Sequence, residues 1–449
     1  MTALAGLLKE RGFSVSGSDL DVYPPMSTFL SDLKIPVHIG FDAEHLASHP
    51  ELVVVGNAMS RGNPEVEAVL NQKLNYVSLP VALREFFIRG KMSCVVAGTH
   101  GKTTTSSLLA WVLEDAGRDP GFFIGGIPEN FGQGFKLGSG EVFVSEGDEY
   151  DSAFFDKHSK FLHYLPDLVI LNNIEFDHAD IFKSYDDVET AFKRLINIIP
   201  GNGYLVACWD DENVKRLCEN AFPKVVSFGL QDGAVWQAKN IDFTRGQTNF
   251  DVHFKNHPFG TFSTPLAGRH NVKNCLAVIA AATELGLTKE EISAGISSFK
   301  NVRRRMQLKG EVNGVKVFDD FAHHPTEIKA TLDGARKRYP QHRIWAIYEP
   351  RTATSKRRVL EDQFVTSLDL ADRVVLAPLH RQDKVPANER LVLENVCRKL
   401  TGKNIPNRVL PANDEMVEYL VNNVEKNDLL LFMSNGDFNQ IPEKLLAKL

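Results

Sequence analysis

The residues from Ser93 to Thr105 have the order that a phosphate-binding turn requires. An apolar strand, Val95 to Ala97, precedes two glycines, and an amphipathic helical pattern then runs to Gly117. The N–H groups of such a turn and the positive helix end hold anionic oxygens, a lysine reaches the terminal phosphates, and a hydroxyl joins Mg²⁺. Val96 replaces the first glycine of the commonest spacing, and an ordinary glycine turn is the weaker alternative. The candidate phosphate-binding residues are Gly98, Thr99, His100, Gly101, Lys102, Thr103 and Thr104.

Two predicted strands end in acidic residues. The strand Val142 to Val144 leads into the cluster Glu146 to Asp151. Carboxylates at strand ends beside a phosphate-binding turn suit Mg²⁺, a hard cation that prefers oxygen ligands. A solvated acidic turn is an equal alternative, and a single histidine is more often structural than a ligand. The second strand, Leu168 to Leu171, is followed by Asn173, Glu175, Asp177 and His178.

Polar motifs also follow the phosphate-binding region. Asn271 and Asn274 stand three residues apart at the start of a predicted helix. Their amides could face an adenine edge, or Asn271 could cap the helix. The basic run 303–305 could clamp phosphates at a hinge, with a solvated linker as the alternative. A strand, acidic residues and histidines recur in order at 317–325.

Length and composition limit the classes of protein. A chain of 449 residues is too long for one core, and a net charge of −6 gives no electrostatic case for a nucleic-acid partner. The five cysteines are widely spaced, which favours a reducing cytoplasm over disulfides or a cysteine metal site. No apolar run is long enough for a membrane span, and the charged start does not fit a signal peptide.

Helical and strand patterns alternate through most of the chain and predict an α/β fold of three consecutive domains. Predicted elements include a helix at 4–11, a strand at 14–17, a helix at 271–285 and a capping box at Thr288. The glycines at 132–134 lack a preceding strand and are interpreted as a loop. We expect a Rossmann-like N-terminal domain at 1–90, a central P-loop ATPase-like domain at 91–306 and a Rossmann-like C-terminal domain at 307–449.

By the order and spacing of its motifs, the chain resembles the Mur ligase family, whose members use ATP to form amide bonds in peptidoglycan synthesis. The resemblance rests on Gly-Thr-His-Gly-Lys-Thr-Thr, Glu-x-Asp-Glu, Asn-x-Glu-x-Asp-His, Gly-x-His-Asn-x-x-Asn, Arg-Arg and Asp-Phe-Ala-His-His-Pro. These motifs run through the whole chain in family order. A nucleotide-dependent switch or binding protein is an alternative of another class, and the missing Gly-x-Gly-x-x-Gly turn disfavours a dinucleotide oxidoreductase.

Two family activities compete, and both use UDP-N-acetylmuramate. One adds L-alanine, and the other attaches the recycled tripeptide L-alanyl-γ-D-glutamyl-meso-diaminopimelate. The second is favoured by residues that resemble its members: Tyr23-Pro-Pro-Met26, Glu175 to Phe182, Glu349-Pro-Arg351 and Met433 to Gly436. The implied cofactors are ATP and Mg²⁺, and the implied partners are these small molecules. Sequence leaves the oligomeric state open.

The resemblance also implies residue roles. Lys102, Glu146, His178 and His323 are expected to be catalytic, with Thr103 and Glu146 on one Mg²⁺ and His178 on a second. Asn271, Asn274, Arg305 and Asp320 complete the expected ATP site, and Arg351, Ser434, Asn435 and Gly436 the peptide site. The UDP-substrate residues are expected to be Ser18, Asp19, Asn57, Ala58 and His100.

Departures from the family concern two places. The family's first strand and glycine-rich loop have no counterpart here, so we expect the uridine site to depend on 16–19 and 57–60. Lys193 stands fifteen residues after His178, where some relatives carry a carbamylated lysine. Ligases that act directly on muramate often lack this modification, and we expect an unmodified Lys193.

Overall fold

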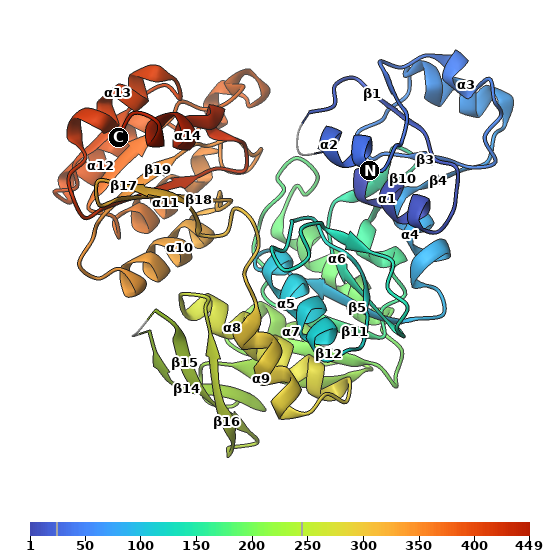
Figure 1. Ribbon diagram of the computed structural model, residues 1–449, viewed down its shortest axis with the longest axis horizontal. Helices are drawn as coiled ribbons and strands as arrows, with labels where there is room; N and C mark the ends of the chain where they lie inside the picture. Colours follow the sequence, from blue (N-terminus) through green and yellow to red (C-terminus); the bar gives the residue numbers. More distant parts are fainter. Residues whose placement is uncertain (24–25, 244–245) are drawn as a thin grey trace.

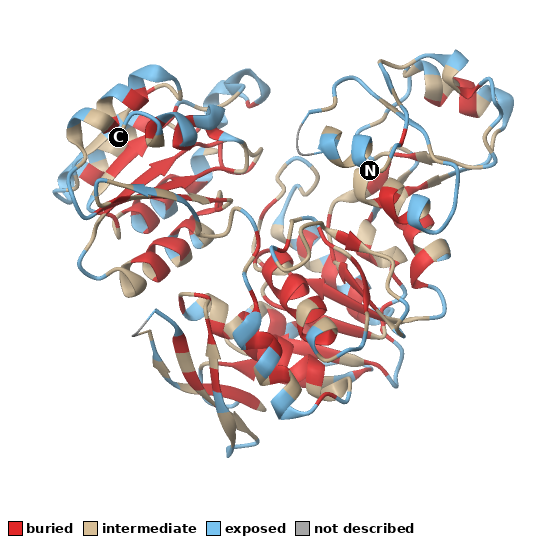
Figure 2. Ribbon diagram, in the orientation of Figure 1, coloured by how far each residue is buried: buried red, intermediate tan, exposed pale blue. Residues whose placement is uncertain are grey.

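A computed structural model describes residues 1–23, 26–243 and 246–449. Pro24 and Pro25 of the Tyr23-Pro-Pro-Met26 motif lie outside the described residues. The ribbon forms an N-terminal, a central and a C-terminal body, each built from helices and strands (Figure 1). Buried residues gather on the sheets and on the helix faces that cover them (Figure 2).

The N-terminal body contains two small parallel sheets. β1 (Gly17–Asp19) pairs with β2 (Val37–Ile39), and β3 (Val53–Val55) pairs with β4 (Tyr76–Ser78). The predicted strand at 14–17 is wrong in position, because the paired segment begins where the predicted one ends. The helices are α1 (Thr2–Glu10), α2 (Met26–Asp32), α3 (Pro64–Gln72) and α4 (Leu79–Leu83). α1 lies directly on the central body, since a Cβ added at Gly6 would come 2.3 Å from the ring of Phe135.

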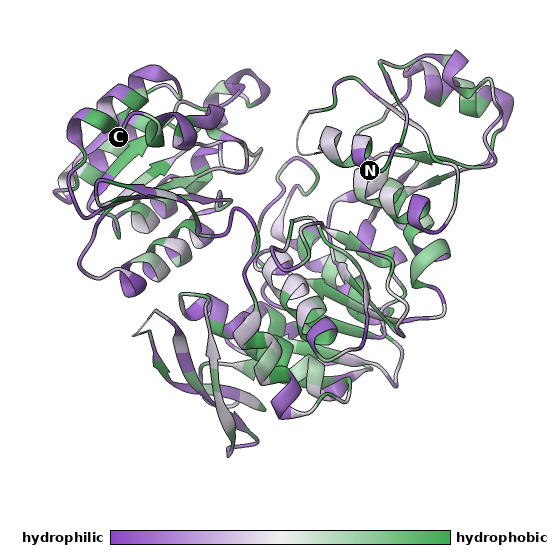
Figure 3. Cartoon of the chain, in the orientation of Figure 1, coloured by the Kyte–Doolittle hydropathy of each residue, from purple (hydrophilic) through white to green (hydrophobic). Residues whose placement is uncertain are grey.

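The central body is organised by a ten-stranded sheet of described residues, with β11 and β8 on either side of β5. These middle strands are apolar along their length because both faces are covered (Figure 3). The sheet strands are β5 (Met92–Ala97), β6 (Gly121–Phe123), β7 (Phe135–Lys136), β8 (Val142–Glu146), β11 (Leu168–Leu171), β12 (Tyr204–Cys208), β13 (Lys224–Gly229), β14 (Trp236–Asp242), β15 (Thr248–Phe254) and β16 (His257–Thr264). β9 (Asp151–Ala153) and β10 (Asp156–Ser159) form a separate hairpin.

Helices cover this sheet and set the direction of its loops. The covering helices are α5 (Lys102–Asp115), α6 (Tyr185–Asn197), α7 (Glu212–Cys218), α8 (Arg269–Glu284) and α9 (Lys289–Ser298). The capping box at Thr288 is confirmed, because its side chain and that of Glu291 bond each other's backbone N–H. The 132–134 segment is a loop, as predicted.

The C-terminal body has a six-stranded sheet in which β17 alone runs antiparallel to its neighbour among the described strands. Its strands are β17 (Gln307–Val312), β18 (Val315–Asp320), β19 (Arg343–Tyr348), β20 (Arg373–Leu376), β21 (Asn407–Val409) and β22 (Asp428–Met433). Its helices are α10 (Pro325–Arg338), α11 (Glu361–Leu368), α12 (Leu393–Gly402), α13 (Asp414–Asn423) and α14 (Ile441–Leu446). Separate apolar clusters pack on the two faces of this sheet.

The topology places the candidate residues at one edge. β5, β8 and β11 are parallel neighbours, so their carboxyl ends meet. The turn before α5, the acidic cluster after β8 and the polar run after β11 therefore converge, as ligand sites in open parallel sheets do. Within the described residues, no helix has both the length and the apolar character needed to cross a membrane.

Candidate active site

The turn between β5 and α5 has a backbone that favours glycine. Gly98 has φ +124°, and a Cβ there would come 2.9 Å from the carbonyl oxygen of Asn173. Gly101 has φ +82° and precedes the first residue of α5. The neighbouring loop fixes the turn, because the His100 N–H donates to Oδ1 of Asn173 at 2.7 Å. The result is a tight turn at a helix N-terminus, which suits phosphate.

Lys102 lies inside this turn and is ion-paired. Its Nζ donates to the carbonyl oxygens of Gly98 at 2.7 Å and Thr99 at 3.0 Å, and lies 2.9 Å from Glu149. Burial lowers the pKa of Lys102, but the charge of Glu149 outweighs it and raises that pKa above its ordinary value. The ammonium is thus charged and held where terminal phosphates would lie.

The sequence reasoning included Glu149 in the acidic cluster after β8 but did not select it as a site residue. It is buried and contacts both Lys102 and His178, whose Nε2 lies 2.9 Å from its Oε1. Burial raises the pKa of Glu149, and Lys102 and His178 together bring it below the ordinary value. The only sequence signal was membership of the acidic cluster after β8.

Thr103 and Glu146 form an oxygen-rich pair that fits Mg²⁺. The Thr103 hydroxyl donates to Oε1 of Glu146 at 2.9 Å, and the Gly125 N–H donates to Oε2 at 2.8 Å. Burial raises the pKa of Glu146. A half-buried carboxylate beside a hydroxyl is a donor set that a hard cation stabilises, so these residues fit the metal that the turn implies.

His178, which lies beside Glu149, has a strained backbone conformation. Its φ is +55°, which is uncommon for a residue with a side chain. Burial lowers the pKa of His178, but Glu149 outweighs this and raises it. The structure pairs His178 with Glu149, and its expected contact with a second Mg²⁺ stays a prediction.

A cavity of about 670 Å³ lies between the central and C-terminal bodies. The capping alternative for Asn271 is wrong, because Gly268 is the N-cap residue of α8 and the Asn271 side chain donates to the carbonyl of Ala267 instead. Asn274 donates in turn to Oδ1 of Asn271 at 3.1 Å. The cavity is lined by predicted nucleotide residues from both bodies: His100, Gly101, Thr104, Asn271, Asn274, Arg305 and Asp320.

Asp320 fixes the turn at the cavity wall as well as lining the cavity. It accepts the N–H groups of Met306 at 2.7 Å and Ala322 at 2.8 Å, and burial raises its pKa to about 6. Arg305 lies with its guanidinium over the Phe321 ring and 4.0 Å from Glu327. That Arg305 and Asp320 belong to the ATP site stays a prediction.

Histidines and carboxylates cross the boundary between the two bodies. His100 lies 3.4 Å from Glu175 and 3.4 Å from Glu327. Burial lowers its pKa, but the two carboxylates outweigh burial and raise it to about 10. The predicted His323 lies 3.9 Å from Asp177, and its neighbour His324, which sequence reasoning did not select, is more deeply buried and lies 3.6 Å from Glu175.

The predicted peptide residues gather around Glu349 in the C-terminal body. Ser434 donates its hydroxyl to Glu349 at 2.7 Å, and Arg351 lies 3.3 Å from the same carboxylate. A Cβ added at Gly436 would come 2.2 Å from a guanidinium nitrogen of Arg351, so a larger residue there would displace the end of that side chain. Within the part of the chain that the structure describes, the buried Oδ1 of Asn435 has no hydrogen-bond partner.

The predicted uridine residues and Lys193 lie apart from this centre. Ser18 and Asp19 belong to β1, and the Ser18 hydroxyl donates a hydrogen bond to the Glu65 carboxylate. Asn57 and Ala58 are exposed and follow β3 of the other small sheet. The Lys193 side chain is 58% exposed and pairs with Glu189 on its own helix, which is consistent with an unmodified lysine.

A glycine turn with a buried lysine, a threonine–glutamate pair and a cavity between two α/β bodies define a nucleotide-binding enzyme. Three domain families match the chain in order: the Mur ligase family catalytic domain at 1–90, the Mur ligase middle domain at 96–282 and the Mur ligase glutamate ligase domain at 304–436. The chain belongs to the Mur ligase family. It is therefore an ATP-dependent, ADP-forming ligase that works with Mg²⁺, and the predicted family, fold class, enzyme class and cofactors are confirmed.

Curated relatives match almost the whole chain. A UDP-N-acetylmuramate–L-alanyl-γ-D-glutamyl-meso-2,6-diaminoheptandioate ligase of Escherichia coli is 42% identical over 99% of this chain and 95% of the relative. A UDP-N-acetylmuramate–L-alanine ligase of Alkaliphilus metalliredigens is 34% identical over 100% of this chain and 95% of the relative. The crystal structure of a murein peptide ligase from Psychrobacter arcticus has a TM-score of 0.73 at 36% identity, and covers 100% of this chain and 96% of its own.

Proposed function

We propose that this ligase joins the lactyl carboxylate of UDP-N-acetylmuramate to the amine of L-alanyl-γ-D-glutamyl-meso-diaminopimelate, in peptidoglycan recycling. The observation that carries the proposal is the convergence of Lys102, Glu149 and the Thr103–Glu146 pair at the ends of β5 and β8. The choice of tripeptide is supported by the higher identity to the ligase of that peptide, 42%, than to the alanine ligase, 34%.

The proposed chemistry is activation of a carboxylate. The substrate carboxylate attacks the γ-phosphorus of ATP, ADP leaves, and an acyl phosphate forms; the peptide amine then attacks the carbonyl carbon, phosphate leaves, and the amine loses a proton. Lys102 would neutralise the terminal phosphate oxygens, and the turn from Gly98 to Gly101 would orient them. Thr103 and Glu146 would hold Mg²⁺, which would neutralise charge on the nucleotide.

The peptide would bind to the C-terminal body. Arg351 can pair with a peptide carboxylate, because a guanidinium offers two parallel N–H donors. Asn435 has a free buried acceptor that a peptide N–H or ammonium group would satisfy. A tripeptide offers several such groups, whereas L-alanine offers few.

We also propose a cytoplasmic location. The described cysteines are free, and Cys94, Cys208, Cys218 and Cys275 are buried as thiols. Free thiols without disulfides fit a reducing compartment. The proposed substrate ATP is consistent with that compartment.

The test is ADP release with UDP-N-acetylmuramate and one amine at a time. The proposal expects turnover with the tripeptide and at most slow turnover with L-alanine at equal concentration. An Arg351→Ala variant should lose tripeptide turnover through a higher KM for the peptide alone. Faster turnover with L-alanine would assign the alternative activity, and ATP hydrolysis that neither amine stimulates would overturn ligation.

A further inference from the structure

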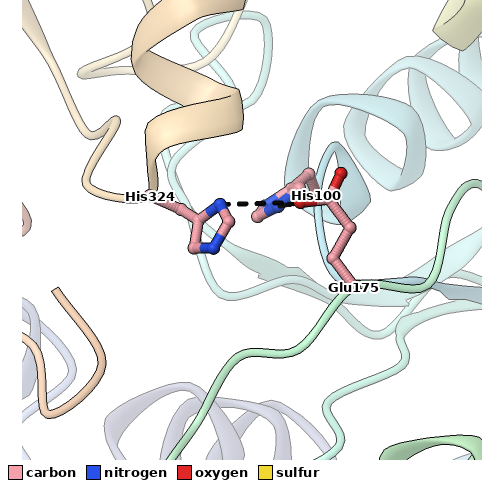
Figure 4. Close-up of side chains that lie close together, drawn as sticks. All are labelled: His100, Glu175 and His324. Carbon is pink, nitrogen blue, oxygen red and sulfur yellow. Dashed lines mark hydrogen bonds and ion pairs between the residues drawn. The ribbon is translucent and has the colours of Figure 1, made fainter. Parts of the chain in front are cut away.

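One group of residues outside the proposed Mg²⁺ pair has the composition of a transition-metal site. Among the described residues, His100, Glu175 and His324 each present a ligand atom within 4.8 Å of the others. His100 comes from the phosphate-binding turn, Glu175 from the loop after β11, and His324 from the start of α10 (Figure 4). The group therefore joins the central body to the C-terminal body.

The separations within the group are those of metal ligands. Nε2 of His100 lies 3.4 Å, and Nδ1 of His324 lies 3.6 Å, from Oε2 of Glu175. Both are too long for strong hydrogen bonds. Ligands about 2.0–2.2 Å from a tetrahedral zinc ion stand about 3.3–3.6 Å from one another, by the geometry of the tetrahedron. Two of the three separations therefore match those around one zinc ion, and all three ligand atoms lie within 4.8 Å of one another.

Surrounding groups orient these ligands as metal sites require. The second ring nitrogen of His100 faces Glu327 at 3.4 Å, and the Thr326 hydroxyl donates to Glu175 at 2.7 Å. A carboxylate behind a histidine and a hydrogen bond on the ligating carboxylate are common outer contacts of bound metals. Nδ1 of His324 accepts the Thr326 N–H only at the long distance of 3.4 Å, so a metal ion would take the place of this weak contact on the Nδ1 lone pair.

We propose that His100, Glu175 and His324 bind one Zn²⁺ ion between the central and C-terminal bodies. Two imidazoles and one carboxylate favour Zn²⁺, Co²⁺ or Ni²⁺ over Mg²⁺, which prefers oxygen. The site is distinct from the Thr103–Glu146 pair, whose donors are all oxygen.

The consequence is a clamp on the domain arrangement. His324 moves with α10 and the C-terminal sheet, whereas His100 and Glu175 move with β5 and β11. An ion that needs all three ligands binds only when the two bodies are together, so it shifts the population toward that closed arrangement. Because His100 is also in the phosphate-binding turn, the clamp acts beside the cavity.

The experiment titrates the chelator-treated full chain with Zn²⁺ alone by calorimetry, in the absence and presence of excess Mg²⁺. We expect one strong site that Mg²⁺ does not displace. His324→Asn should weaken binding by more than about 100-fold, since even outer contacts are worth 10–100-fold. Asn keeps a helix cap at this position, and Glu175→Gln gives an independent loss of the same site if His324→Asn folds poorly.

Two histidine variants serve as controls. His257→Asn removes an exposed imidazole on β16, and His178→Asn removes the histidine beside Glu149. Both should bind Zn²⁺ as the unmodified chain does. Unchanged affinity in His324→Asn and Glu175→Gln would overturn the site, as would loss of binding in either control.

Small-angle scattering supplies a readout of the clamp. Zn²⁺ should reduce the radius of gyration of the unmodified chain, or keep it at the value of the closed arrangement. It should not change the radius of gyration of His324→Asn. Strong Zn²⁺ binding with equal scattering effects in both proteins would overturn the clamp. Neither measurement uses a substrate, so its failure is separate from failure of the proposed ligase reaction.

Discussion

Replacing Lys102 with Met should stop turnover and also destabilise the fold. The side chains of Lys102 and Glu149 are only 13% and 3% exposed, at a separation of 2.9 Å. Breaking a buried pair by removing one partner costs roughly 3–5 kcal/mol, because the other charge is left in a poor solvent. We place this case near ~3 kcal/mol, since His178 remains beside Glu149. Loss of the phosphate contact should reduce kcat by about 10²–10³.

A double variant separates the two effects. In Lys102→Met/Glu149→Gln neither charge of this ion pair remains, and replacement of both partners of such a pair is often close to neutral. The double variant should therefore regain most of the lost free energy of unfolding and none of the lost turnover. Glu149→Gln alone provides the fourth corner of the cycle.

Urea denaturation gives the stability of all four proteins, and ADP release gives their turnover. Near-normal turnover in Lys102→Met would refute the assignment of this lysine to the phosphates. If the double variant is as unstable as Lys102→Met, the instability comes from lost packing or lost carbonyl contacts, and the charge argument is wrong.

Further expectations concern metal, peptide, helix surface and pH. Glu146→Gln should raise the Mg²⁺ concentration for half-maximal turnover at least ~10-fold, because it removes a charged oxygen ligand; an overlaid Mg²⁺ titration would contradict this. Arg351→Lys should raise the KM for the tripeptide and leave that for UDP-N-acetylmuramate unchanged, because lysine cannot bind a carboxylate through two parallel donors; equal changes in both would count against a peptide site. Lys193→Ala should change stability by less than ~0.5 kcal/mol, as for an exposed pair, and added bicarbonate should not affect turnover of either protein; a bicarbonate requirement would reveal a carbamate. Burial lowers the pKa of His270 from 6.5 to about 4, so the unfolded chain is protonated first as pH falls and the folded state loses stability between those values. His270→Gln should flatten that acid decline in thermal melts, and parallel pH profiles would contradict it.

Local patterns were enough to predict much of the central body. The strand at Leu168–Leu171 was predicted with its observed bounds because a run of four apolar residues between polar segments has few alternatives. The same argument placed Glu146 at the end of β8 and His178 in the polar run after β11, and the parallel order brings these two segments together. The strand near Gly17 was misplaced because the residues there are mostly exposed and carry no periodic signal.

Contacts between distant segments could not be read from the sequence. Glu149 is three residues from Glu146 in the chain, and only the path of the acidic loop decides which of them meets Lys102. His323 and His324 are adjacent, so the orientation of α10 decides which one faces Glu175. Such choices depend on how the segments pack. The two candidates in each comparison are of the same residue type, so the sequence gives no reason to prefer one of them.

The contacts across the domain boundary explain why chemistry and closure are linked in this chain. His100 contacts Glu327 and Thr326 contacts Glu175, so α10 of the C-terminal body touches the turn and loop that carry the nucleotide site. The Ala179 N–H, one residue after His178, donates to the Thr354 hydroxyl of the same C-terminal body. Separation of the bodies would expose the cavity to water and remove these contacts together. The proposed acyl phosphate would therefore form beside a boundary that these contacts hold together.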